Sequence, residues 1–284
     1  MKYFLVLVIT VMLFPGCSKI KDFLDDYRNP PQPNEITCRL DTVYPVEPGI
    51  PALDRTTAAG IHYNDKGNPV LVNYTFDHYG IFHIPVHYIY DEKDRLIEIL
   101  PVIDSITQKD LYEKPVRVVY VYEGNSMVPL RDTIFRNDFT WGNEIEELYY
   151  DAAGRINRVF RKLTTDASYD LETRYTYDAK GNKQVTLDFE GKTPPPLEYS
   201  DNPSLYSLHP VWQLIHKDYS KNSLKVPVKT VNEQGLPESL DYNVVSGYYG
   251  YPVHDAAWPF TLFLGVESGK ELRYEYQCTE GNNK

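Results

Sequence analysis

The clearest shortage in this sequence is one of basic charge. Its 284 residues include 29 Lys and Arg against 40 Asp and Glu, which gives a formal net charge of −11, and no basic patch stands out. Binding to nucleic-acid phosphates needs clustered Lys and Arg side chains. We therefore expect no nucleic-acid partner.

The short motifs of the common enzyme and metal-binding classes are also missing. The sequence has no Gly-x-Ser-x-Gly, no His-Glu-x-x-His and no glycine-rich phosphate loop. Its densest histidine group, His78, His83 and His87, lies in a strand-like stretch that contains Pro85. On a strand, positions 83 and 87 are about 13 Å apart, too far for one zinc ion. We predict no metal site, no cofactor and no catalytic residue.

Carboxylates occur close together at Glu144, Glu146 and Glu147. We interpret them as solvated strand or turn residues. A glycosidase-like pair of carboxylates brought together by folding stays open as an alternative, and with it an unrecognised hydrolase.

Long apolar runs are missing as well. The longest, Tyr3–Phe14, follows Lys2 and has 12 residues, which is too short to span a bilayer as a helix but suits a signal peptide. The run ends in Phe14-Pro15-Gly16-Cys17, which resembles the lipobox of bacterial lipoproteins. This resemblance implies that residues 1–16 are removed and that Cys17 carries lipid. The alternative is an ordinary secretory signal with an incidental cysteine, although no Ala-x-Ala site supports it.

Residues 17–35 are charged and then rich in proline, as expected of a tether. Ser18 resembles the residue that follows the lipidated cysteine in lipoproteins sent to the outer membrane. The acidic stretch just beyond it resembles export signals of surface-exposed lipoproteins. We expect an outer-membrane lipoprotein that faces the periplasm or the cell surface, with the membrane as a partner through its lipid anchor.

What the sequence does have is a repeated turn signal. It reads "YNDKG" at 63–67, "YDEKD" at 90–94, "YDAAG" at 150–154, "YDAKG" at 177–181 and "VNEQG" at 231–235. The Asp or Asn positions are spaced by 27, 60, 27 and 54 residues, so a period near 27 recurs. The Asp or Asn side chain can accept backbone hydrogen bonds in a turn. The Gly, replaced by Asp94 in the second copy, closes a bulged hairpin in the left-handed conformation.

Each repeat of this length holds two strands and two turns. We therefore predict an all-β fold, an antiparallel β-hairpin meander that forms a curled single sheet with a short helix packed on it. It should have about ten or more strands between residues 36 and 278, within one domain at 36–284.

The stretches "YYDAAGRI" and "YTYDAKGN" look like the YD repeat of Rhs-type bacterial surface proteins. That family winds many repeats into a shell around a toxin, and the copies here are too few to enclose anything. The sequence also resembles small outer-membrane lipoproteins of unknown function, in which YD-like hairpins are interrupted by an Asn-Pro segment, a short helix and a Lys-Asn turn. Residues 200–223 match that interruption.

The interruption predicts a helix near 208–217 with Pro210 in its first turn. Its apolar residues fall on one helical face: Leu208, Val211, Trp212, Ile215 and Tyr219. We interpret the helix as a cover for the concave side of the sheet, with a ligand-binding lid as the alternative.

Cys38 and Cys278 alternate in phase with apolar residues of the first and last predicted strands. A bridge needs Cα atoms within about 7 Å, and a meander places these strands at opposite ends unless the sheet curls to meet. We expect two unbridged buried thiols, with a disulfide as the alternative.

Three functions follow from these observations. The first is a cell-envelope scaffold that binds a protein or peptide. The second is a glycan-binding module that uses Tyr and Trp side chains, including Trp141, with Tyr249 and Trp258 as ligand-binding candidates. The third is the unrecognised hydrolase.

Overall fold

The structure is a computed structural model. It describes residues 36–46, 59–77, 81–102, 115–136, 142–165, 170–188, 191–225, 228–241 and 271–280. The predicted signal peptide, the tether and Cys17 lie outside these residues, as do Trp141, Tyr249 and Trp258.

The chain forms two compact units. The larger one is Arg39–Gln277, and the smaller one joins the residues up to Cys38 with those from Cys278 onward. Within the described part of the chain, no helix is long and apolar enough to cross a bilayer.

Sixteen strands and two helices are described. The strands are β1 Ile36–Val46, β2 Ala59–Tyr63, β3 Pro69–Asp77, β4 Ile81–Tyr90, β5 Leu96–Pro101, β6 Pro115–Val121, β7 Arg131–Arg136, β8 Glu144–Tyr150, β9 Ile156–Leu163, β10 Leu171–Tyr177, β11 Lys183–Leu187, β12 Tyr199–Pro203, β13 Asn222–Leu224, β14 Val228–Val231, β15 Pro237–Asp241 and β16 Glu271–Glu280. The helices are the 3₁₀ turn η2, Leu205–Leu208, and the α-helix α4, Pro210–His216.

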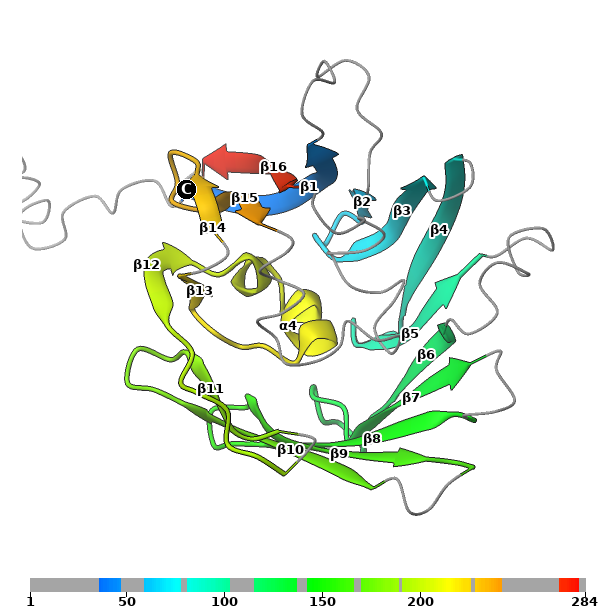
Figure 1. Cartoon of the computed structure of the whole chain (residues 1–284). Coiled ribbons are helices and arrows are strands. Elements are labelled where there is room, and N and C mark those ends of the chain that lie inside the picture. The colour runs from blue at the N-terminus through cyan, green and yellow to red at the C-terminus, as the bar shows by residue number, and fades with distance from the viewer. Residues whose placement is uncertain are drawn as a thin grey trace, which may run out of the picture. The chain divides into compact units, whose positions relative to one another are not determined.

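Fourteen strands form one antiparallel sheet, which confirms the predicted hairpin meander. Strands β1 to β11 follow one another in sequence order, and β16, β15 and β14 continue the sheet beyond β1. The sheet curls around α4 (Figure 1). Strands β12 and β13 form a second, two-stranded sheet, so the expectation of one sheet was slightly too simple.

The core of the larger unit lies between the inner face of the sheet and α4. Val211, Trp212 and Ile215 of the helix join a buried cluster with residues from most strands of the large sheet, and the Trp212 side chain is fully buried. The predicted apolar face of the helix is thus confirmed as a cover for the sheet. Burying large aromatic and aliphatic side chains in this way supplies the main stabilisation of such a core.

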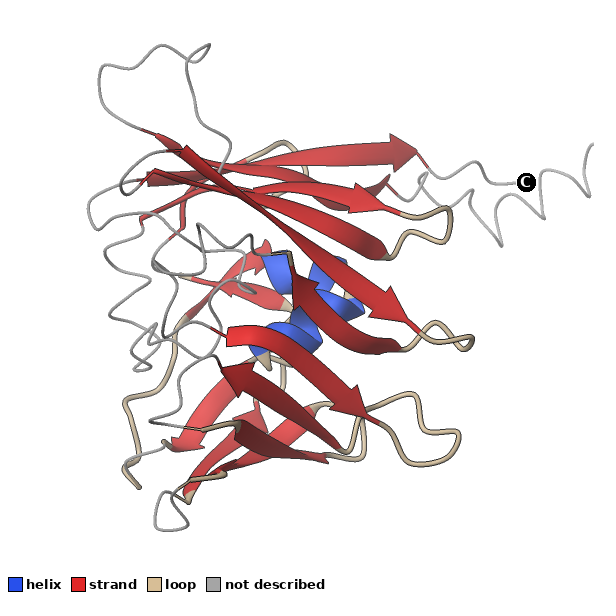
Figure 2. Cartoon of the chain, turned by 90° about the vertical axis from the view of Figure 1, so that its right-hand side faces the viewer, coloured by secondary structure: helices blue, strands red, loops and turns tan. Residues whose placement is uncertain are grey.

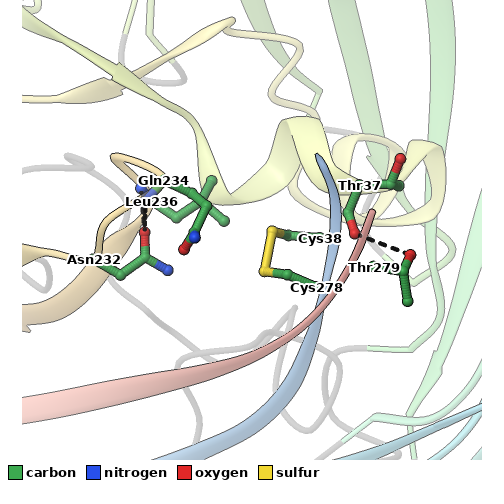
Figure 3. Close-up of a disulfide and its surroundings, with 7 residues drawn as sticks. All are labelled: Thr37, Cys38, Asn232, Gln234, Leu236, Cys278 and Thr279. Atoms are coloured by element: carbon green, nitrogen blue, oxygen red, sulfur yellow. Dashed lines mark hydrogen bonds between the residues drawn. A yellow bond between two sulfur atoms is a disulfide. The ribbon is translucent and has the colours of Figure 1, made fainter. Parts of the chain in front are cut away.

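Cys38 and Cys278 form a disulfide in the smaller unit (Figure 3), with their Cα atoms 4.0 Å apart. The hydroxyl of Thr279 also donates to the carbonyl oxygen of Thr37, at 3.5 Å. Our expectation of two buried free thiols was wrong, because β16 pairs with β1 instead of ending the sheet. Cys38 is buried and Cys278 is exposed.

Candidate functional site: the turn array and a buried charge cluster

The stretch "YYDAAGRI" forms the turn between β8 and β9. The backbone N–H of Gly154 donates to the carbonyl of Asp151 at 3.0 Å, and the N–H of Asp151 donates to the carbonyl of Arg155 at 2.9 Å. The Asp151 side chain accepts from the N–H groups of Ala153 and Arg155 at 2.9 and 3.0 Å. Gly154 has a φ of 76°, which a side chain would disfavour. This confirms the predicted roles of Asp and Gly.

The same geometry recurs at the turns that begin at Asn64, Asp91, Asp178 and Asn232. Asp94, which replaces Gly, has a φ of 59° as predicted. We call these four turns, together with the one at Asp151, the turn array. Figure 2 shows hairpin turns gathered at one end of the strands. A further copy at 188–192 has the same backbone bonds; the sequence analysis missed it because Asp188 follows Asp178 by only 10 residues and so falls outside the period near 27.

The tyrosine that precedes a turn reaches back to the preceding hairpin. Tyr90 donates its hydroxyl to the carbonyl of Pro69 at 2.8 Å, and Tyr177 donates to that of Ile156 at 2.9 Å. Each acceptor is the first residue of the strand that follows the previous turn. Tyr122 makes the equivalent bond to Leu96, the first residue of β5. The hydroxyls of Tyr63, Tyr150 and Tyr199 also donate to backbone carbonyls, those of Leu40, Pro129 and Lys183. These bonds link neighbouring parts of the sheet.

The arginine after a turn links forward to the next hairpin. Arg155 pairs with Asp151 at 2.6 Å, and its guanidinium lies 4.0 Å from the ring centroid of Tyr177. Arg95 pairs with Asp91 and stacks on Tyr122 in the same way. Although burial disfavours the charge of Asp151, hydrogen bonds from Arg155 and the backbone hold its pKa below the usual range. The polar residues that recur in the repeat therefore stabilise the turns and link neighbouring hairpins.

The carboxylates at 144–147 do not behave as predicted. Glu144 and Glu146 are buried, with 3% and 0% of their surface exposed, and only Glu147 is partly exposed. On β8 these two residues alternate in phase with the buried Leu148, so they point to the inner face of the sheet. The prediction that they are solvated was wrong, because cations from β9 and from the end of α4 reach them there.

These groups form what we call the charge cluster: Asp132 on β7, Glu144 and Glu146 on β8, Arg161 on β9 and Lys217 at the end of α4. Arg161 lies 2.6 Å from both Glu144 and Glu146. Lys217 lies 2.5 Å from Glu146 and 3.4 Å from Asp132. Three acidic side chains therefore face two basic ones in a buried position.

The pKa values of Asp132 and Glu146 are shifted in opposite directions, although burial alone would raise both. Burial raises the pKa of Asp132 to about 8, although Lys217 acts against this. Burial also disfavours the charge of Glu146, but Lys217 and Arg161 outweigh it and lower its pKa to about 2. The pKa values of the two groups differ because Glu146 pairs with both Lys217 and Arg161, whereas Asp132 pairs with Lys217.

The backbone of the helix end places Lys217 in the cluster. Lys217 is the C-cap residue of α4 with a φ of 50°, a conformation that residues other than Gly seldom adopt. Its neighbour Asp218 pairs with Lys183 on β11 at 3.4 Å. The N-cap is His209, whose Nδ1 accepts from the N–H of Val211 at 3.2 Å. Burial lowers the pKa of His209 to about 4, which keeps the ring neutral and able to accept.

The histidines considered as metal ligands do not form a site in the described residues. His87 is exposed on β4; His78 and the side chain of His83 lie outside what the structure describes. Among the described residues, no group of three or more His, Cys, Asp or Glu side chains could hold a metal ion. The sequence signal for the charge cluster was the alternation of residues along β8, which places Glu144 and Glu146 on the same face of the strand as the apolar Leu148.

No protein-family model and no curated protein sequence matches the chain. Among solved structures, a porin-like protein from Bacteroides uniformis is 11% identical, with a TM-score of 0.44, and the alignment covers 87% of this chain and 99% of that one. The TcdB2–TccC3–TEV structure and the Photorhabdus luminescens Tc holotoxin pore give TM-scores of 0.28 at 11% identity. Those two alignments cover 58% and 72% of this chain, which spans only 11% of each toxin chain.

Proposed function

We propose that this chain is a lipid-anchored cell-envelope protein that acts as an interaction scaffold and binds rather than catalyses. The observation that carries this proposal is the turn array. Its Asp, Asn, Tyr and Arg side chains make hydrogen bonds, ion pairs and ring contacts within the sheet. The repeated chemistry of the sequence therefore builds a rigid frame, on which irregular segments can present a binding surface.

The charge cluster does not favour a hydrolase. Asp132 and Glu146 have pKa values that differ in the way an acid and a base would. Both carboxyl groups are nonetheless buried, with 1% and 0% of their residues' surface exposed, and Lys217 at the end of α4 pairs with both of them. A substrate could reach them only if the helix moved away.

The loop between β6 and β7 supports a protein partner. It exposes Met127 and Leu130, with 63% and 52% of their surface accessible. Arg95 donates to the carbonyls of Gly124 and Ser126 at 3.1 and 3.0 Å, so the loop is held in place. Exposed apolar residues on an ordered loop are typical of protein interfaces, where Met is enriched.

Crosslinking from this loop tests the proposal. A photo-reactive amino acid at position 127 of the full chain in intact cells should give a discrete crosslinked protein, which Leu130→Ser should reduce severalfold. The control is the same amino acid at Ile89, an exposed apolar position on β4, which should not give that product. An absence of crosslinks at 127, or the same products at both positions, would count against the scaffold.

A further inference from the structure

We propose that the charge cluster is a proton-dependent latch for residues 199–224, which we call the insertion. While one proton is shared between the carboxyl groups of Asp132 and Glu146, the insertion stays closed on the sheet; when that proton leaves, closure weakens.

The charge cluster contains more acidic than basic side chains. Among the ion pairs of the described residues, three ionised carboxylates face two cations, which leaves one negative charge in excess at a buried position. An uncompensated buried charge is costly enough that the group usually takes up a proton instead. The cluster is therefore built to hold a proton.

The contacts identify where the proton resides. Glu144 and Glu146 each have a cation within 2.6 Å, whereas the only cation paired with Asp132 in the described residues is Lys217, at 3.4 Å and shared with Glu146. The neighbour of Asp132 is the carboxyl group of Glu146. Two carboxyl groups can bond to each other only when one is protonated, so Asp132 carries the proton and donates it to Glu146.

The other charged and titratable groups described around Asp132 do not balance its charge in place of this proton. Lys217 pairs with Asp132 and Glu146, and Arg161 pairs with Glu144 and Glu146. The titratable groups that interact electrostatically with the cluster from neighbouring elements are Tyr120 on β6, Tyr150 on β8, Tyr219 after α4 and His216 in α4. Burial raises the pKa of the tyrosines, that of Tyr219 to about 12, and lowers that of His216 to about 3. These four groups stay neutral between pH 5 and pH 9.

The position of Lys217 connects the proton to the insertion. Lys217 is the residue at which α4 ends, and its ammonium is the only contact with the cluster that the insertion makes among the described ion pairs. When Asp132 loses its proton, like charges on Asp132 and Glu146 repel each other beneath the helix. When the insertion opens, water can solvate both carboxylates. Deprotonation of Asp132 therefore stabilises the open state relative to the closed state.

The sign of the pH dependence follows from the raised pKa of Asp132. The proton on Asp132 stabilises the closed state. This stabilisation is complete below the ordinary carboxyl pKa of about 4 and is lost as the pH rises through about 8. Glu146, with its pKa lowered to about 2, acts in the opposite direction only as the pH falls below the ordinary range. Between pH 5 and pH 8, the closed state should therefore weaken steadily as the pH rises.

Hydrogen exchange of the full chain tests this latch. Amide protection factors of residues 205–219, relative to those of β3 and β4, should fall by about tenfold or more between pH 6 and pH 8. In Asp132→Asn, whose amide can donate to Glu146 at any pH, the fall should be less than twofold. The control Asp65→Asn removes an exposed turn carboxylate and should keep the wild-type fall.

An unchanged pH dependence in Asp132→Asn, or a pH-independent insertion in the wild type, would overturn the latch. A measurement on the wild type alone covers the case in which the variant does not fold. The carbon resonance of the Asp132 carboxyl group should titrate near pH 8, and titration near pH 4 would refute the proposal.

Discussion

At the scale of single residues, the repeated stretch assigns one task to each polar position. In "YYDAAGRI", Tyr150 bonds to the previous hairpin, Asp151 caps its own turn and Arg155 pairs with Asp151 and stacks on the next tyrosine. The tasks of Asp and Gly could be predicted from sequence because their partners lie within four residues. Those of Tyr and Arg could not, because their partners lie a hairpin away.

Replacement of Tyr177 by Phe tests the link between hairpins. The change removes the hydroxyl that donates to the carbonyl of Ile156 at 2.9 Å. We expect a loss of about 1–2 kcal/mol in the free energy of unfolding, because a partly buried acceptor is left unpaired. Urea denaturation measures it. Tyr149→Phe is the control, since its exposed hydroxyl meets only Glu147, and it should change stability by less than half as much.

Replacement of Gly154 by Ala tests the turn itself. No atom lies within 4 Å of where the new Cβ would stand, so any cost comes from the φ of 76° alone. We expect a loss of about 1–2 kcal/mol by urea denaturation. Gly154→Asn should lose clearly less, since Asn tolerates this conformation; equal losses for Ala and Asn would contradict the account.

At the scale of elements, the helix was predictable and its anchoring was not. The spacing of Val211, Trp212 and Ile215, together with Pro210, placed α4 within a few residues of its observed bounds. The charge cluster draws on β7, β8, β9 and the end of α4, and no local pattern shows that these elements meet. Glu144 and Glu146 look like surface residues until Arg161 and Lys217 are placed beside them.

Replacement of Lys217 by Met tests how strongly the helix end is anchored. The change leaves Glu146 and Asp132 buried without their shared cation, and breaking a buried pair typically costs about 3–5 kcal/mol. Chemical denaturation at pH 7 should show a loss of that order. The matched control is Lys180→Met, whose ion pair with Asp201 is exposed and should contribute less than about 1 kcal/mol. A Lys217 variant as stable as this control would mean that the cluster does not hold the helix.

At the scale of the whole molecule, the sheet order differs from the sequence order at one place. The meander and its number of strands followed from the repeat, but the return of β16 to β1 did not. The sequence between β15 and β16 carries no turn signal that fixes where the last strand pairs. The pairing of β16 with β1 brings Cys38 and Cys278, which are 240 residues apart in the sequence, close enough to form the disulfide.

The double replacement Cys38→Ser and Cys278→Ser tests the contribution of the disulfide. Closing a loop of 240 residues should stabilise the protein by about 5 kcal/mol, because the disulfide lowers the conformational entropy of the unfolded chain. Thermal unfolding of the variant should occur at a lower temperature, and a reducing agent should lower the wild type to the same value. A reductant effect that persists in the variant would show that another process is responsible.

The central claim about function is that the chain is a lipid-anchored envelope protein, and intact-mass measurement of the membrane-extracted protein tests it most directly. The account predicts a chain that begins at Cys17 and carries the added mass of acyl groups, with Cys17→Ala released from the membrane fraction. An unmodified N-terminus at any other residue would contradict it.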